Sequence, residues 1–333
     1  MHITQPDYYS DFSCIAGDCP DTCCVGWQVI IDPKHLEYYS SLDGELGETI
    51  RKGITVSDGE ASFSLCNGRC AMLREDKLCK IQYALGEEAL SKVCGFYPRF
   101  VTELGLTREQ GLSVSCPEVA RLLLTRTDPI TYITTQTDEP LRYFHDIEPE
   151  VMLSVRQRKQ KALELIRDRS KSLDTRLLSI LDISRDGECP IPVARKGEME
   201  AFYSHLYRLY SSLEQLRPEW GELLNRCKDA KPILNPSDDI CWEQLMSYYL
   251  FKYSLRSAMD DDFEIKLRRS VLNILLLRDI RRKENIDIIY LVQLFAKETE
   301  HNEDNLDAID KALEALPCFS ANSLQSILLW SIS

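Results

Sequence analysis

The chain has 333 residues, of which 44% are hydrophobic and 28% charged, values typical of a folded globular protein and not of a disordered one. Its 40 basic and 53 acidic residues give a net charge of −13, and no basic stripe is evident. This balance argues against nucleic acid or an anionic membrane as partner and favours a basic or lysine-bearing one.

The first residues, MHITQPDYYSDFSC, contain neither the basic segment nor the apolar segment that directs secretion. The longest strongly apolar stretch, 271–277, is far too short to span a bilayer. We therefore expect a cytoplasmic protein without membrane segments. In a reducing compartment its 13 cysteines are expected to bind metal or to do thiol chemistry, and the odd total also fits a set of disulfides poorly.

In chain order, the first part of the sequence predicts short strands, turns and helices. The apolar, β-branched run 27–31 predicts a strand. Asp32 and Pro33 then predict the start of a helix, with Asp32 as its N-cap and Pro33 as its first residue. This helix is expected to continue to Ile50. Residues 54–64 have alternating flanks around an Asp-Gly pair, which predicts a β-hairpin.

Residues 75–125 also predict short strands, turns and helices. A turn is expected at 75–77, followed by a helix over 81–93 with one apolar side. Segments 100–106 and 112–115 predict a second hairpin. A proline then introduces the helix expected at 118–125.

Beyond residue 128 helical patterns dominate. Apolar residues recurring every three to four positions predict helices at 151–182, 196–226, 239–258, 262–282, 286–300, 304–315 and 321–331, with breaks at 187–192 and 231–237. The predicted fold is α+β but mostly α: a small cysteine-rich α+β domain, residues 1–127, packed on an α-helical array, residues 150–333. Residues 128–149, rich in Pro, Thr and Asp, are the expected connection.

Nine of the 13 cysteines lie in the first 116 residues. Closely spaced cysteines on tight turns can bring soft thiolates together around a metal, and more distant ones can complete the set. The pattern therefore predicts a metal site, built from Cys14-x4-Cys19-x3-Cys23-Cys24, Cys66-x3-Cys70-x8-Cys79, Cys94 and Cys116.

The spacing narrows the choice of metal. It matches neither the paired C-x2-C of zinc ribbons, nor the C-x2-C-x2-C run of ferredoxins, nor the C-x3-C-x2-C triad of radical enzymes that use S-adenosylmethionine. Since His35 is the one histidine near these cysteines, an all-thiolate iron–sulfur cluster is favoured, with zinc as the alternative. The isolated cysteines are expected to pack in the interior: Cys189, Cys227, Cys241 and Cys318.

Several enzyme classes lack their sequence signatures in this chain. There is no Gly-rich loop of the dinucleotide-binding kind, no H-E-x-x-H and no G-x-S-x-G. The histidines are dispersed without ligand spacing: His2, His35, His145, His205 and His301. A hydrolase and a Rossmann-type methyltransferase are therefore not predicted.

Two stretches, FSCIAGDCPDTCCVGWQVIID and CAMLREDKLCKIQYALGEEALSKVCGFYPR, resemble the flagellin lysine N-methylase family. They are also similar to a broader group of zinc- or iron-chelating proteins with clustered cysteines. The shared features are the Cys pair before Gly26-Trp27, the C-x3-C-x8-C spacing, the Leu-Gly-Glu of 85–87 and the Cys-x-x-Tyr-Pro-Arg of 94–99. The resemblance covers approximately residues 8–120.

The resemblance implies transfer of a methyl group from S-adenosylmethionine to lysines of flagellin. It also implies an iron–sulfur cluster, of the 4Fe-4S type, held by cysteines of this region. The implied ligand pool is Cys14, Cys19, Cys23, Cys24, Cys70, Cys79, Cys94 and Cys116. The catalytic residues and the methyl-donor site are not specified by it.

Other roles stay open. The chain could be a non-catalytic zinc- or iron-binding module with a helical partner-binding domain, or an electron-transfer protein. For methyl transfer, Trp27, Tyr83 and Tyr97 could line a channel for the lysine cation, with core packing as the alternative. Arg99 could bind a carboxylate of the donor, with an ordinary salt bridge as the alternative, and Glu87 and Glu88 (87–88) are expected on a solvated face.

Overall fold

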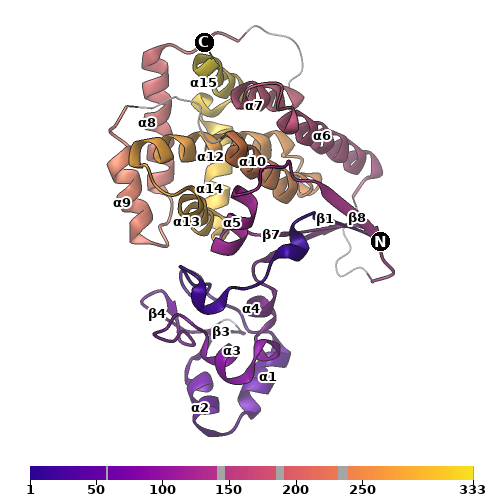
Figure 1. Cartoon of the computed structure of the whole chain (residues 1–333), viewed down its shortest axis with the longest axis vertical. Coiled ribbons are helices and arrows are strands. Elements are labelled where there is room, and N and C mark those ends of the chain that lie inside the picture. The colour runs from indigo at the N-terminus through magenta and orange to yellow at the C-terminus, as the bar shows by residue number, and fades with distance from the viewer. Residues whose placement is uncertain (58, 141–146, 185–190, 232–238, 333) are drawn as a thin grey trace.

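The structure is a computed structural model that describes residues 1–57, 59–140, 147–184, 191–231 and 239–332. It is mostly helical, with small sheets near the N-terminus, so the predicted fold class is confirmed. The name cysteine-rich unit is used for residues 7–98, between the first strand and the four-stranded sheet's next strand. In the view of Figure 1 this unit lies at the bottom, the helical array lies at the top, and a small sheet lies between them.

The cysteine-rich unit begins with two helices, α1 (Pro33–Ser41) and α2 (Gly44–Lys52). Asp32 caps α1, because its carboxylate accepts from the backbone N–H of His35, as predicted. The single helix predicted as far as Ile50 is wrong, because the chain breaks after α1. Gly44 has a φ of +77° at the start of α2, a left-handed conformation that interrupts the helix.

The first predicted hairpin is confirmed as β2 (Ile54–Ser57) and β3 (Glu60–Phe63), with position 58 outside the described residues. The strand predicted at 27–31 is not a regular strand. It is an extended segment held on β3 by hydrogen bonds from Ile31 N–H to the Ala61 carbonyl (2.8 Å) and from Phe63 N–H to the Val29 carbonyl (3.0 Å).

Shorter elements complete this unit. They are β4 (Leu65–Cys66), β5 (Arg69–Cys70), α3 (Lys80–Leu85), the 3-10 helix η3 (Glu87–Ala89) and α4 (Lys92–Phe96). The turn predicted at 75–77 is present, with Lys77 at a φ of 65°. The continuous helix predicted over 81–93 is wrong, because Gly86 adopts a φ of 86° and ends α3.

A four-stranded sheet joins this unit to the helices. Its order is β6-β7-β1-β8, where β1 (His2–Pro6) is parallel to β7 (Thr107–Leu112) and antiparallel to β8 (Tyr132–Gln136). The second hairpin is formed by β6 (Arg99–Leu104) and β7, so its second strand lies earlier than the predicted 112–115. The reason is that the chain turns at Gly105, which has a φ of 54°.

The remaining helices are α5 (Pro117–Leu124), α6 (Pro149–Arg167), α7 (Leu173–Leu181), α8 (Lys196–Ser212), α9 (Pro218–Cys227), α10 (Asp239–Ser254), α11 (Ser257–Asp260), α12 (Phe263–Glu284), α13 (Ile288–Glu300), α14 (Glu303–Ala315) and α15 (Ala321–Ile332). The helices predicted at 151–182, 196–226 and 239–258 are each two helices. Ser172 caps α7 and Pro218 begins α9, and both mark the new starts. The predicted breaks at 187–192 and 231–237 lie largely outside the described residues.

The buried apolar side chains form two clusters. The larger one surrounds α12, in which every residue from Leu267 to Ile280 is buried, and it extends to the inner face of the sheet. The smaller one lies within the cysteine-rich unit, around Tyr39, Phe63 and Met72. Among the described helices, none is long and apolar enough to cross a membrane.

Candidate metal centre

Four cysteine thiols meet in the cysteine-rich unit. The thiol of Cys24 lies close enough to those of Cys23, Cys70 and Cys79 for the four to shift one another's pKa. Three separate segments bring them together: the loop before Trp27, the end of β5 and the N-cap of α3. The loop is tied to β5 by its backbone, because Cys70 N–H donates to the Cys24 carbonyl at 2.9 Å.

These thiols line a small cavity of about 20 Å³. Cys94, from α4, lines it too, so five members of the predicted ligand pool share one space. A cavity of this size holds about one water molecule and is no substrate pocket. Its remaining walls are mostly apolar and aromatic: Trp27, Val29, Tyr39, Phe63, Met72, Ile81, Leu90, Ser91 and Tyr97.

The contacts among the cysteines that line the cavity favour the thiolate form of some of them over the neutral thiol. Hydrogen bonding from Cys24 lowers the pKa of Cys79 to about 6, and backbone N–H groups at the start of α3 add to this effect. The same interaction lowers the pKa of Cys23 and of Cys70, and it raises that of Cys24. Burial raises the pKa of Cys94 to about 12. Three of these five sulfurs are thus disposed to lose a proton to a metal.

The other candidate cysteines do not line this cavity. Cys14 and Cys66 are exposed, and Cys19 is half-buried with a pKa raised by burial. Cys116 caps α5, and burial raises its pKa to about 11. Cys14 and Cys19 are close enough to Cys116 for their charges to act on it, so these three form a second, looser group.

The donor set fits a thiophilic centre. In the part of the chain that the structure describes, no three His, Cys, Asp or Glu side chains are arranged as they would be around a bound metal ion. The cavity nevertheless has five sulfur donors in its lining and neither carboxylate nor imidazole. Soft all-thiolate sets are typical of iron–sulfur clusters and of structural zinc.

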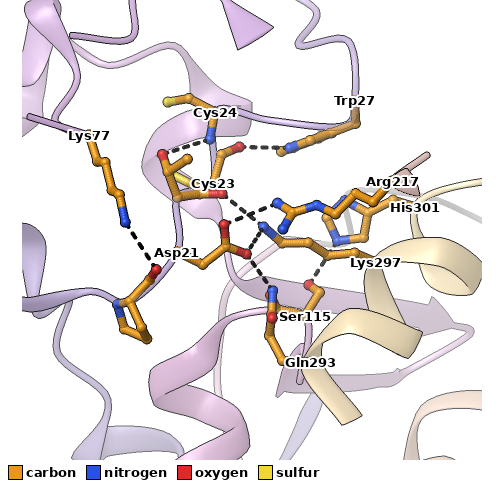
Figure 2. A network of polar contacts seen from close by, with 12 residues as sticks. Asp21, Cys23, Cys24, Trp27, Lys77, Ser115, Arg217, Gln293, Lys297 and His301 are labelled. Carbon is orange, nitrogen blue, oxygen red and sulfur yellow. Dashed lines mark hydrogen bonds and ion pairs between the residues drawn. The ribbon is translucent and has the colours of Figure 1, made fainter. Parts of the chain in front are cut away.

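A polar network connects the cysteine loop to the helical array (Figure 2). The carboxylate of Asp21 accepts from Lys297 Nζ at 2.6 Å and from Gln293 Nε2 at 2.7 Å, both on α13, and from Arg217 Nη2 at 3.1 Å, just before α9. Burial opposes ionisation of Asp21, but Lys297 and Arg217 outweigh it and hold the pKa of this carboxyl at about 2. Lys297 also donates to the carbonyl of Thr22 at 2.8 Å.

Two aromatic rings of the cavity lining, Trp27 and Tyr97, pack against His301. Trp27 donates from Nε1 to the Cys23 carbonyl (2.8 Å), and its ring centre lies 5.1 Å from that of His301 and 5.9 Å from that of Tyr97. His301 Nε2 lies 2.8 Å from the Ser115 hydroxyl, and burial lowers its pKa to about 4, so it is uncharged near neutral pH. At these spacings the rings pack against one another and leave no room between them for a lysine cation.

Other residues considered from the sequence lie elsewhere. Tyr83 is exposed, with the Arg74 guanidinium 3.6 Å from its ring centre, and Arg99 lies 5.4 Å from the ring of Phe12. Glu87 and Glu88 (87–88) are exposed, as expected.

The isolated cysteines largely pack as predicted. Cys227 is buried in the larger core, and Cys241 and Cys318 lie against it. Cys189 lies outside the described residues.

The sequence does not predict the helical half of this site. Asp21 was passed over beside the cysteines, and Lys297 and His301 lie far away in sequence. One signal is available: Gln293, Lys297 and His301 recur every four residues on α13 and its C-cap, a polar stripe that begins inside the mostly apolar run 288–296. Such a stripe indicates a buried polar interface.

A second hollow lies on the outside of the unit. It is an open groove of about 490 Å³ between α1 and the 3-10 helix η3, lined by Lys34, His35, Glu37, Tyr38, Ser41, Leu85, Glu88 and Ala89. Tyr39 separates it from the cavity, because its hydroxyl donates to the Ala89 carbonyl at 2.7 Å. No cysteine lines the groove.

The chain has recognisable relatives. It is 32% identical over 133 residues to the flagellar biosynthetic protein FliU of Salmonella muenchen, a match that covers 38% of this chain and 79% of that protein. It is 28% identical over 244 residues to the lysine-N-methylases of Salmonella choleraesuis and Salmonella typhimurium, which covers 69% of this chain.

The match covers 58% of each lysine-N-methylase, so this chain corresponds to little more than half of their length. No family model and no solved structure matches the chain. The similarity to FliU, which extends over most of that protein, agrees with the resemblance found in the cysteine motifs. The chain belongs to the family of the flagellar biosynthetic protein FliU and the lysine-N-methylases.

Proposed function

We propose that the chain is a protein lysine N-methyltransferase that transfers methyl groups from S-adenosylmethionine to flagellin. The observation that carries the proposal is the meeting of four thiols around Cys24 in a relative of proteins named lysine-N-methylase. In this proposal Cys23, Cys24, Cys70 and Cys79 hold an iron–sulfur cluster, and zinc is the alternative metal.

The proposal also assigns roles to the other candidate cysteines. Cys94 lines the same cavity and is the next candidate ligand. Cys14, Cys19 and Cys116 belong to the second group at the junction with α5. When bound, an iron–sulfur cluster would supply a centre that accepts or donates one electron.

The proposed reaction sets clear chemical demands. The ε-ammonium of the target lysine must lose a proton, so that its nitrogen can attack the methyl carbon in line with the carbon–sulfur bond. That bond breaks, and the donor leaves as a neutral thioether with the electron pair. The net charge of −13 favours approach of a lysine-bearing substrate. We assign cofactor binding to the cysteine-rich domain, residues 1–127, and docking of flagellin to the helical array, residues 150–333.

Two measurements test the proposal in order. Protein purified without oxygen is first examined for iron, zinc and sulfide content and for broad visible absorption, which is expected for a cluster. The loaded protein is then incubated with S-adenosylmethionine labelled in its methyl group and with purified flagellin. Label is expected on flagellin lysines; loaded protein that leaves every lysine unlabelled would refute the enzymatic function.

The second candidate is a non-catalytic zinc- or iron-binding module with a helical partner-binding domain. The small volume of the cysteine cavity, about 20 Å³, favours it, because a purely structural metal centre needs no room for substrate. Colourless protein with stoichiometric zinc that binds flagellin and transfers no label would select this module over the enzyme.

A further inference from the structure

We propose that Lys297, on α13 of the helical array, holds the cysteine loop in place and balances the negative charge of the thiolate centre. It is a positioning residue that acts on the ligands through the loop. The inference rests on the proposed metal centre at Cys23, Cys24, Cys70 and Cys79.

The first argument is how the loop is held. Lys297 Nζ donates to the carbonyl of Thr22 (2.8 Å) and to the carboxylate of Asp21 (2.6 Å). The hydroxyl of Thr22 in turn accepts from the backbone N–H of Cys24 (3.2 Å). Asp21 and Thr22 directly precede Cys23 and Cys24, so the residues next to two ligands are held by a helix from the other end of the chain, as Figure 2 shows.

The second argument is electrostatic. The side chain of Lys297 is 4% exposed, so little water screens its charge from the nearby sulfurs. Both charged groups lie beside the ligand loop, because the ammonium contacts the carbonyl of Thr22, directly before Cys23, and the carboxylate belongs to Asp21, two residues before Cys23. Arg217 donates to Asp21, and its charge also acts on Glu298 of α13. His301, the other basic side chain nearby, is neutral.

A metal centre with four thiolates makes the sign of these effects predictable. A divalent ion bound by four thiolates forms a site with a net charge of about −2. A neighbouring cation stabilises the bound state and a neighbouring anion destabilises it. Lys297 and Asp21 are therefore expected to influence metal affinity in opposite directions, although they are hydrogen-bonded to each other.

The experiment measures competitive binding of Co²⁺ to the full chain at one pH near neutrality, with the thiolate-to-cobalt absorption band as readout. Lys297→Gln is expected to weaken binding about tenfold, which corresponds to one pKa unit of interaction. Asp21→Asn, which keeps oxygen and size, is expected to strengthen it. Lys297→Arg keeps the charge and should restore affinity. Lys159→Gln is the matched control, because Lys159 is also buried and paired, with Glu109, but lies on α6.

The outcomes are distinct. Opposite shifts in Lys297→Gln and Asp21→Asn, with the control unchanged, support the proposal. Weaker binding in both Lys297→Gln and Asp21→Asn would mean that the contact between these residues only holds the loop in place, which overturns the charge role. Equal affinities in all variants would overturn both roles. If the wild-type chain shows no cobalt–thiolate band and, purified without oxygen, contains neither iron nor zinc, the proposed metal centre itself is wrong and this inference falls with it. If it shows no band but contains iron, the divalent-ion site on which this inference rests is wrong and the inference falls alone.

Discussion

The carboxylate of Asp21 and the ammonium of Lys297 lie 2.6 Å apart, although 276 positions separate them in the chain. Their contact joins the loop that carries the first cysteines to α13 of the helical array. The candidate metal centre is therefore not a property of the cysteine motifs alone, because part of its support comes from the far end of the sequence.

Replacement of Cys24 should have a larger effect on metal content than replacement of a cysteine outside the site. Cys24 contacts three other thiols, so Cys24→Ala removes the sulfur that the others share. We expect loss of most bound metal in Cys24→Ala, measured by elemental analysis of anaerobically purified protein. Cys318→Ala, at a half-buried position against the larger core, should retain wild-type content. Equal content in the two variants would remove Cys24 from the site.

Glu298 should make stability depend on pH. Burial raises the pKa of this carboxyl to about 7, and its Oε1 atom has no hydrogen-bond partner among the described residues. Between about pH 4 and pH 7 the folded state therefore holds a proton that the unfolded state has lost, so stability falls as the pH rises through this window.

Glu298→Gln should remove that dependence. It is expected to be more stable than the wild type by roughly 2 kcal/mol above pH 7 and nearly equal to it near pH 4. Urea unfolding at several pH values measures the difference. A constant difference across the range would show that Glu298 does not titrate as described.

Arg108 offers a comparison between a buried and an exposed partner. Its side chain is 2% exposed and contacts Glu103, which is 1% exposed, and Glu139, which is 52% exposed. Glu103→Ala removes the buried partner and leaves the buried guanidinium with the exposed carboxylate of Glu139 alone, so it should cost about 3 kcal/mol of unfolding free energy. Glu139→Ala should cost about 1 kcal/mol or less, because water replaces the lost carboxylate. Similar costs for both, measured by urea unfolding, would contradict this assignment.

Two helical glycines should respond to alanine in opposite ways. A Cβ at Gly47, on α2, would lie 2.1 Å from the carbonyl oxygen of Leu42, a backbone atom that cannot move aside cheaply. Gly47→Ala should therefore destabilise the protein by about 2 kcal/mol. Gly197, on α8, has no atom within 4 Å of such a Cβ, so Gly197→Ala should stabilise the protein by up to about 1 kcal/mol. Thermal unfolding of both variants checks the difference.

Local signals in the sequence predicted local structure well. Asp32 with Pro33 predicted the start of α1, and the Asp-Gly pair predicted the first hairpin, because capping and turn formation depend on neighbouring residues. Element ends were less predictable. Gly86 ends α3 through a left-handed backbone conformation, which an apolar pattern with helical spacing does not reveal.

The candidate site likewise has a part that local sequence signals predict and a part that they do not. The crowding of Cys23 and Cys24 pointed to a metal site, and the structure brings them together with Cys70 and Cys79. The positions of Lys297 and His301 depend on how α13 packs against the cysteine-rich unit. No spacing within one segment encodes such a contact, so His301 counted in the sequence as one dispersed histidine.

The strands β1 and β6 have a mechanical consequence for the cysteine-rich unit. The chain leaves the sheet after β1 and returns to it at β6, so the unit is tethered to the sheet at two points. A body tethered at two points can still rock about the line that joins them. The contact of Asp21 with α13 is a third support, which restrains that rocking and sets the tilt of the thiol cavity relative to the helices.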